Sequence, residues 1–208
     1  MTMNIRWKKW LGYVGVMLFT IHCSLFTISC SEDDSTTDEF ANWQQRNNAV
    51  VNQWSNNSAL RKIKSYTKDQ TTGGTSNDYI YVEVLEEGAG TESPLFTDSV
   101  WVAYRGRLIP TISSPEGYVF DQSYTGDFSW RTADMAQFCV GSLVSGFSTA
   151  LMQMHRGDRW RVHIPYHLGY GATSNSSIPG YSNLIFDIAL LDFWHPGETR
   201  PEFKSREI

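Results

Sequence analysis

Cysteine and charge are both scarce in this chain. Its 208 residues include three cysteines, too few and too unevenly spaced for a disulfide framework or a zinc site. Charged residues make up 19%, and the net charge of −5 is unsuited to electrostatic binding of nucleic acid. By contrast, 41% of the residues are hydrophobic and 14% aromatic, which excludes a disordered chain and a coiled coil. We therefore expect a folded core and no nucleic-acid partner.

Signals of common catalytic chemistry are missing as well. No serine lies in a nucleophile elbow, and no glycine-rich phosphate loop precedes a helix. His163 and His167 are four residues apart, but Pro165 lies between them in a strand pattern, so two surface histidines are favoured over a zinc site. Cys139 lies in an apolar run and is expected to be a buried, inert thiol. We expect no metal and no cofactor.

The N-terminus has the pattern of an export signal. Arg6, Lys8 and Lys9 form a positive region, and residues 10–28 are almost uncharged. A stretch of this length, about nineteen residues, can span a bilayer, so a retained membrane anchor remains an alternative to cleavage.

The end of that stretch, Thr27-Ile28-Ser29-Cys30, resembles the lipobox of bacterial lipoproteins, although the family usually has leucine at the position of Thr27. The resemblance implies a signal peptide over residues 1–29 and a lipid on Cys30, so the chain would be anchored to the cell envelope, on the periplasmic or the outer surface of the outer membrane. The acidic run at residues 31–34 is interpreted as a solvated tether, or as a signal for the outer face of the cell.

Residues 30–67 are expected to hold this tether and an amphipathic helix. Thr36 and Glu39 fit a capping box at its start, and Asn56-Asn57-Ser58 ends it. The apolar stripe recurs at helical spacing and comprises Phe40, Trp43, Val50, Val51 and Trp54. Such a stripe needs a partner surface, either on the following domain or on another protein.

The rest of the chain predicts one α+β domain. Residues 68–78 are polar and glycine-bearing, which indicates a linker, and alternating apolar residues then predict strands from Tyr79. A helix pattern lies between Ser142 and Arg156, with Gly157 as its stop, and further strands follow. We expect an antiparallel, twisted sheet around one short helix in residues 79–194, and an aperiodic tail in residues 195–208.

Several segments of this domain occur in a recognisable order. They are Val102–Leu108, Phe120–Ser123, Phe138–Gly141 with Val144–Phe147, Met152–Asp158, Ile164–Pro165 with Leu168–Ala172, Ile178–Pro179, and Leu184–Leu191. In this order they resemble the FKBP-type peptidyl-prolyl cis/trans isomerases, from about Tyr79 to Phe193. The resemblance implies an FKBP-like fold, isomerase activity on proline-containing polypeptides, and binding of macrolide inhibitors.

The resemblance also implies a proline pocket. Its catalytic residues would be Tyr104, Asp121 and Tyr170, and its substrate-binding residues Phe120, Phe138, Leu143, Val144, Phe147, Ile178 and Phe186. Phe147 would form the floor, the Tyr170 hydroxyl and the Ile178 amide would donate to substrate carbonyls, and Asp121 would lie near the reacting amide. The loop at residues 173–177 departs from the family pattern, which is expected to alter the choice of peptides and inhibitors rather than the activity.

Two functions are compatible with these residues. The first is a folding catalyst for exported proteins, because an apolar pocket can lower the barrier to X–Pro rotation without an acid, a base or a metal. The second is a proline-binding or chaperone module in which turnover has been lost. The polar ends of Tyr104, Asp121 and Tyr170 favour the first, since a packed core has little use for them.

Overall fold

The computed structural model describes residues 38–200, and the chain from Asp38 onward forms one compact unit. The predicted signal peptide, Cys30, Thr36 and the end of the C-terminal tail lie outside the described residues. The helices are α2 (Trp43–Asn56) and α3 (Ser145–Leu151), and the strands are β1 (Arg61–Lys64), β2 (Tyr79–Glu86), β3 (Ser99–Leu108), β4 (Val119–Gln122), β5 (Ala136–Cys139), β6 (Arg159–Ile164) and β7 (Leu184–Trp194). No helix in this part of the chain is long and apolar enough to cross a membrane.

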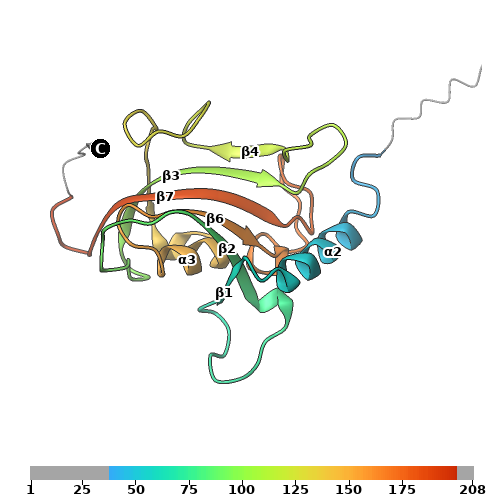
Figure 1. Cartoon of the computed structure of the whole chain (residues 1–208), viewed down its shortest axis with the longest axis horizontal. Helices are drawn as coiled ribbons and strands as arrows, with labels where there is room; N and C mark the ends of the chain where they lie inside the picture. Colours follow the sequence, from blue (N-terminus) through green and yellow to red (C-terminus); the bar gives the residue numbers. More distant parts are fainter. Residues whose placement is uncertain (1–37, 201–208) are drawn as a thin grey trace, which may run out of the picture. The chain divides into compact units, whose positions relative to one another are not determined.

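The seven strands form one antiparallel sheet in the order β1-β2-β6-β7-β3-β4, with β5 also paired to β3. The longest strands, β3 and β7, are neighbours and pair along their whole length. α3 lies against one face of the sheet (Figure 1). The predicted α+β architecture, an antiparallel sheet around a short helix, is thus confirmed.

The core lies between α3 and the sheet. Phe147, Ala150 and Leu151 of α3 and Met154 beyond it are all buried against alternating residues of β6 and β7. The helix is shorter than the predicted range from Ser142 to Arg156, because a 3₁₀ turn precedes it and turns follow it. Gly157 adopts a φ of 88°, the left-handed conformation expected of a stop residue.

α2 begins later than the capping-box pattern predicts. Asn42 has a φ of 54°, which interrupts helical geometry before Trp43, and the Glu39 carboxylate accepts hydrogen bonds from Thr111 and Ser113 rather than from a helix N-terminus. The capping-box prediction is therefore wrong at Glu39, whereas the predicted end near Asn56 is correct. Contacts with a distant loop compete successfully with the local cap.

α2 docks on its own domain, one of the two alternatives left by the sequence. The Trp43 indole Nε1 donates to Ser182 Oγ at 2.8 Å. Fully buried Asn47 accepts from the Asn183 backbone N–H at 2.8 Å, and the Asn183 side chain donates to the Asn47 carbonyl at 2.7 Å. These paired amides satisfy buried polar groups and fix the helix on the loop before β7.

Two side chains differ from their predicted surroundings. His163 is not a surface residue: Trp54 of α2 packs on its ring with centroids 4.9 Å apart, and its Nδ1 is buried with no partner among the described residues. Burial lowers the His163 pKa to about 4. Cys139 is exposed rather than buried, since it ends β5 on the outward side of the alternating strand.

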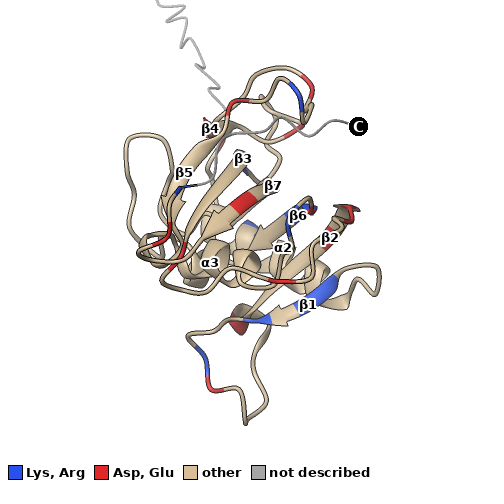
Figure 2. Ribbon diagram, turned by 90° about the vertical axis from the view of Figure 1, so that its left-hand side faces the viewer, with Lys and Arg blue, Asp and Glu red and all other residues tan. Residues whose placement is uncertain are grey.

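The predicted linker at residues 68–78 connects two strands of the same sheet. β1 precedes it and pairs with β2, so the sheet begins before the predicted domain boundary at Tyr79. Arg61, Lys62 and Lys64 make this strand basic along the sheet edge (Figure 2). Charged edge strands discourage pairing between the sheets of different molecules.

Candidate functional site

Five aromatic rings meet on the face of the sheet that α3 covers. We call Tyr104, Phe120, Phe138, Phe147 and Phe186 the aromatic cluster; they come from β3, β4, β5, α3 and β7. Ring centroids of Phe147 and Phe186 are 5.0 Å apart, and those of Tyr104 and Phe138 are 5.6 Å apart, both with edge-to-face geometry. Phe120 also meets Phe186 edge to face at 5.5 Å. The structure thus brings together rings that are separated by up to 82 residues in sequence.

A glycine in β3 makes this packing possible. A Cβ at Gly106 would lie 2.5 Å from the ring of Phe186 and 2.6 Å from the ring of Phe120. Side chains two residues apart on a strand share a face, so Gly106 shares its face with Tyr104. The absence of a side chain at Gly106 leaves the space that the two phenylalanine rings occupy.

The polar edge of the cluster is formed by Tyr104 and Asp121. The Tyr104 hydroxyl donates to Asp121 Oδ2 at 2.8 Å, and burial, followed by this hydrogen bond, raises the Tyr104 pKa above its ordinary value. The Tyr104 N–H donates to Ser123 Oγ at 3.0 Å, which ties β3 to the segment after β4. The hydroxyl of Tyr104 therefore remains protonated, and its direction is fixed by an exposed carboxylate.

Tyr170 lies at the exposed side of the site. Its side chain is 44% exposed, whereas Phe147 and Phe186 are only 3% and 5% exposed. Burial of part of the ring, followed by the charge of Asp121, raises the Tyr170 pKa. Its hydroxyl is thus a protonated donor at neutral pH.

Leu143, Val144 and Ile178 pack on the same core, with Ile178 buried and the other two partly exposed. The Ile178 N–H does not point to an open acceptor position, because it donates to Asn175 Oδ1 at 2.8 Å. The predicted donor role of this amide is therefore not available in this conformation. Val144, at the start of α3, is different, since its N–H donates to no group within residues 38–200.

Asn175 is the site residue that sequence reasoning missed. Its Oδ1 also accepts from the Ser177 N–H at 3.0 Å, and its own N–H donates to the Ile178 carbonyl at 2.9 Å. These bonds shape the loop that departs from the family pattern. A signal was present, because asparagine often closes such turns through its side chain.

Comparison with known proteins agrees with this geometry. Residues 90–191 match the family model described as FKBP-type peptidyl-prolyl cis-trans isomerase. The chain is 34% identical to the macrophage infectivity potentiator of Trypanosoma cruzi over 125 residues, 60% of this chain and 58% of the relative. It is 31% identical to the FKBP-type isomerase FkpA of Escherichia coli K12 over 129 residues, 62% of this chain and 43% of the relative.

The fold is shared with a solved structure. A crystal structure of a peptidyl-prolyl cis-trans isomerase from Pseudomonas syringae superposes with a TM-score of 0.54 at 24% identity, covering 74% of this chain and 95% of that one. The chain spans about half the length of the curated relatives it matches. With the fold and the sequence match in agreement, residues 90–191 form a domain of the FKBP-type peptidyl-prolyl cis-trans isomerase family.

Proposed function

We propose that this chain catalyses cis/trans isomerisation of X–Pro bonds in polypeptides and so assists the folding of exported proteins. The observation that carries the proposal is an aromatic cluster with one polar edge, where the Tyr104 hydroxyl is held by Asp121. Rings on the buried side suit the pyrrolidine of proline, and the Tyr170 hydroxyl on the exposed side suits a flanking backbone carbonyl.

The physics of the reaction explains why such a site suffices. Rotation about the amide has a barrier of about 18–20 kcal/mol because conjugation stabilises the planar bond. The twisted transition state loses that conjugation and is less dipolar than the planar form, so replacing water with aromatic walls favours it. Each preference of about 1.4 kcal/mol for the twisted state accelerates rotation roughly tenfold.

Donors around the cluster would hold the substrate backbone in a twisted pose. Tyr170 offers its exposed hydroxyl, and Val144 offers a backbone N–H that is not used within the described residues. Val144 takes the role that the sequence assigned to Ile178, whose amide already has an acceptor in Asn175. Macrolide inhibitors, which present carbonyls on an apolar ring, would use the same donors.

We also propose that the chain acts at the cell envelope. This rests on the export pattern of residues 1–29 and on the lipobox-like segment that ends in Cys30. The test is labelling with a fatty-acid analogue in cells. Label on the wild type that disappears in Cys30→Ala supports lipidation, and label that persists in the variant contradicts it.

The activity is tested by the rate of proline isomerisation in a chromogenic peptide. Acceleration that scales with the concentration of the full-length chain supports an isomerase. An unchanged rate, together with binding of the same peptide, would leave a proline-binding module instead.

A further inference from the structure

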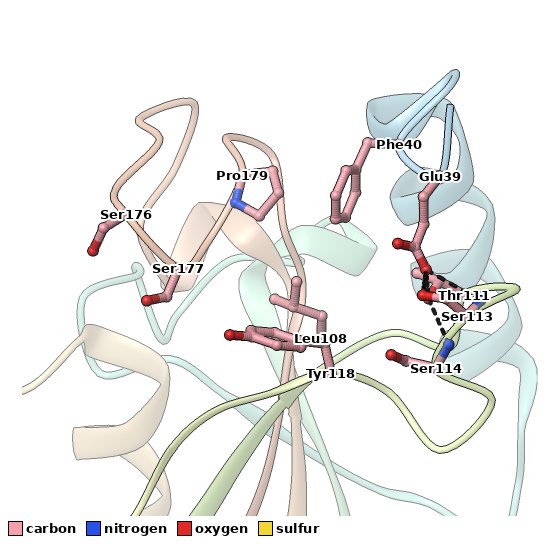
Figure 3. Close-up of a pocket in the computed structure, with 10 residues that line it drawn as sticks. All are labelled: Glu39, Phe40, Leu108, Thr111, Ser113, Ser114, Tyr118, Ser176, Ser177 and Pro179. Carbon is pink, nitrogen blue, oxygen red and sulfur yellow. Dashed lines mark hydrogen bonds between the residues drawn. The ribbon is translucent and has the colours of Figure 1, made fainter. Parts of the chain in front are cut away.

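A pocket lies at the end of β3, lined by none of the residues assigned to the proline pocket. We call it the Glu39 pocket; its volume is about 440 Å³, and its walls include Glu39, Phe40, Leu108, Tyr118, Ser177 and Pro179. Figure 3 shows the Glu39 carboxylate on one side, and Pro179 and Ser177 on the other. The walls thus come from the segment before α2, from the β3–β4 connection and from the loop before β7.

The pocket lies beside the residues assigned to the proline pocket: Leu108 follows Tyr104 on the same strand, and Ser177 and Pro179 flank Ile178. Along β3, Tyr104 and Leu108 share a face, and both belong to one buried cluster. The Leu108 N–H donates to the Tyr118 carbonyl at 3.0 Å, which places Tyr118 beside the end of β3. Four residues of strand cover about 13 Å. A polypeptide bound with proline at the cluster would therefore reach the Glu39 pocket three or four residues away.

The carboxylate of Glu39 is fixed and charged. Its Oε1 accepts three hydrogen bonds, from Thr111 Oγ1, Ser113 Oγ and the Ser113 N–H, the last at 3.2 Å. These bonds, with the Ser113 hydroxyl contributing most, lower the Glu39 pKa. Oε2 accepts no hydrogen bond from residues 38–200. The Arg46 guanidinium donates to the Glu39 backbone carbonyl at 2.7 Å rather than to the carboxylate.

Two of the other wall residues, Phe40 and Tyr118, are aromatic and exposed. Phe40 is 39% exposed and Tyr118 is 50% exposed, so both rings are accessible beside the free carboxylate oxygen. Ring faces bind the aliphatic stem and the cationic end of lysine or arginine, and a carboxylate adds charge complementarity. The same carboxylate repels acidic side chains of a substrate.

We propose that the Glu39 pocket is a second substrate subsite, which takes a lysine or arginine side chain three or four residues from the isomerised proline. The proposal rests on the isomerase function above and narrows its substrate class. The occupant is the polypeptide substrate itself, because the pocket lies beside the residues that would bind the proline and its carboxylate complements a cationic side chain.

The test compares peptides that differ at one position. Each carries one proline and has lysine, norleucine or glutamate placed two to five residues to either side. The full-length chain, kept in mild detergent because of its apolar N-terminal stretch, is assayed by exchange NMR for kcat/KM on each peptide. We expect kcat/KM for the lysine peptide to exceed that for the norleucine peptide by about threefold or more when the residue lies three or four positions from the proline, on one side of it. The glutamate peptide should have the lowest kcat/KM of the three. Added salt should bring this ratio towards one.

Glu39→Gln is the decisive variant, because glutamine keeps an oxygen to accept the bonds from Thr111 and Ser113 but has no charge. It should remove the lysine preference. Glu87→Gln, the same change at an exposed carboxylate beyond β2, should keep it. Equal rates for lysine and norleucine at every position, or a preference that survives Glu39→Gln, would overturn the proposal. If no peptide is isomerised, the proposed function fails instead, and the ratio of dissociation constants for the same peptides decides the lysine preference.

Discussion

The Tyr104 hydroxyl donates to Asp121 Oδ2 at 2.8 Å. Tyr104 is buried, with 8% of its surface exposed, whereas Asp121 lies at the surface. This bond joins the aromatic cluster to its polar edge. Hydrogen bonds to charged groups contribute about 1.5–3 kcal/mol, so Asp121→Ala should lower kcat/KM about tenfold or more. The same bond contributes to folding, and because Asp121 is exposed, its loss should lower the free energy of unfolding by only about 1 kcal/mol.

A variant of Tyr104, the hydrogen-bond partner of Asp121, tests the same bond. Tyr104→Phe removes the donor and keeps the ring, and its loss should not add to that of Asp121→Ala if the two residues act through one bond. A double-mutant cycle on kcat/KM measures the coupling. Fully additive losses would show that the two side chains act separately.

Tyr170 should act through its hydroxyl alone. Tyr170→Phe keeps the half-exposed ring and removes the donor, and we expect kcat/KM to fall about fivefold with unfolding changed by less than about 0.5 kcal/mol. Steady-state rates and denaturant unfolding check the two parts. Wild-type rates in the variant would exclude Tyr170 as a substrate donor.

We expect the backbone N–H groups of Ile178 and Val144 to differ in hydrogen exchange. The Ile178 N–H is held by Asn175, so its hydrogen exchange should accelerate in Asn175→Ala and stay slow in Asn175→Asp, which keeps an acceptor oxygen. Addition of a proline peptide to the wild type should slow exchange at Val144 and leave Ile178 unchanged. If the peptide slowed exchange at Ile178 alone, the Ile178 N–H would be the donor to the substrate carbonyl.

Gly106 should be among the least tolerant positions of β3. The Cβ of alanine would lie within 2.6 Å of the Phe120 and Phe186 rings, so Gly106→Ala should destabilise the fold by about 1–3 kcal/mol and lower activity. Gly73→Ala is the matched control, since nothing lies within 4 Å of its added Cβ. Equal unfolding midpoints for the two variants would contradict the packing of the aromatic cluster.

His163 should make stability depend on pH. Its pKa is about 4 in the folded protein against 6.5 as the ordinary value, so the unfolded chain binds the proton first as pH falls. Stability should therefore decrease between pH 6.5 and 4, by about 3 kcal/mol at most. In His163→Phe, whose ring can still pack on Trp54, the decrease should be smaller by this amount. Equal pH slopes for both proteins would contradict the buried, neutral imidazole.

Local patterns predicted the elements that depend on local chemistry. The alternation of Trp160, Val162 and Ile164 appears as β6, and Gly157 takes the expected left-handed conformation. Predictions failed where a distant group competes with a local one. Glu39 binds Thr111 and Ser113 rather than a helix end, and Trp54 covers His163.

In the candidate site too, some features could be predicted from the sequence and others depend on contacts in space. The rings of the aromatic cluster could be named from the order of the segments, because the family pattern specifies them. The Asn175 contact with Ile178 and the open N–H of Val144 could not, since both depend on how the loop before β7 and the start of α3 are arranged in space.

The most direct measurement is the exchange rate between cis and trans forms of a short proline peptide, followed by NMR with catalytic amounts of the full-length chain. We expect the rate to rise in proportion to the wild-type concentration and about tenfold less steeply with Asp121→Ala. A rate equal to that of the peptide alone, from a folded wild-type chain, would contradict the isomerase function.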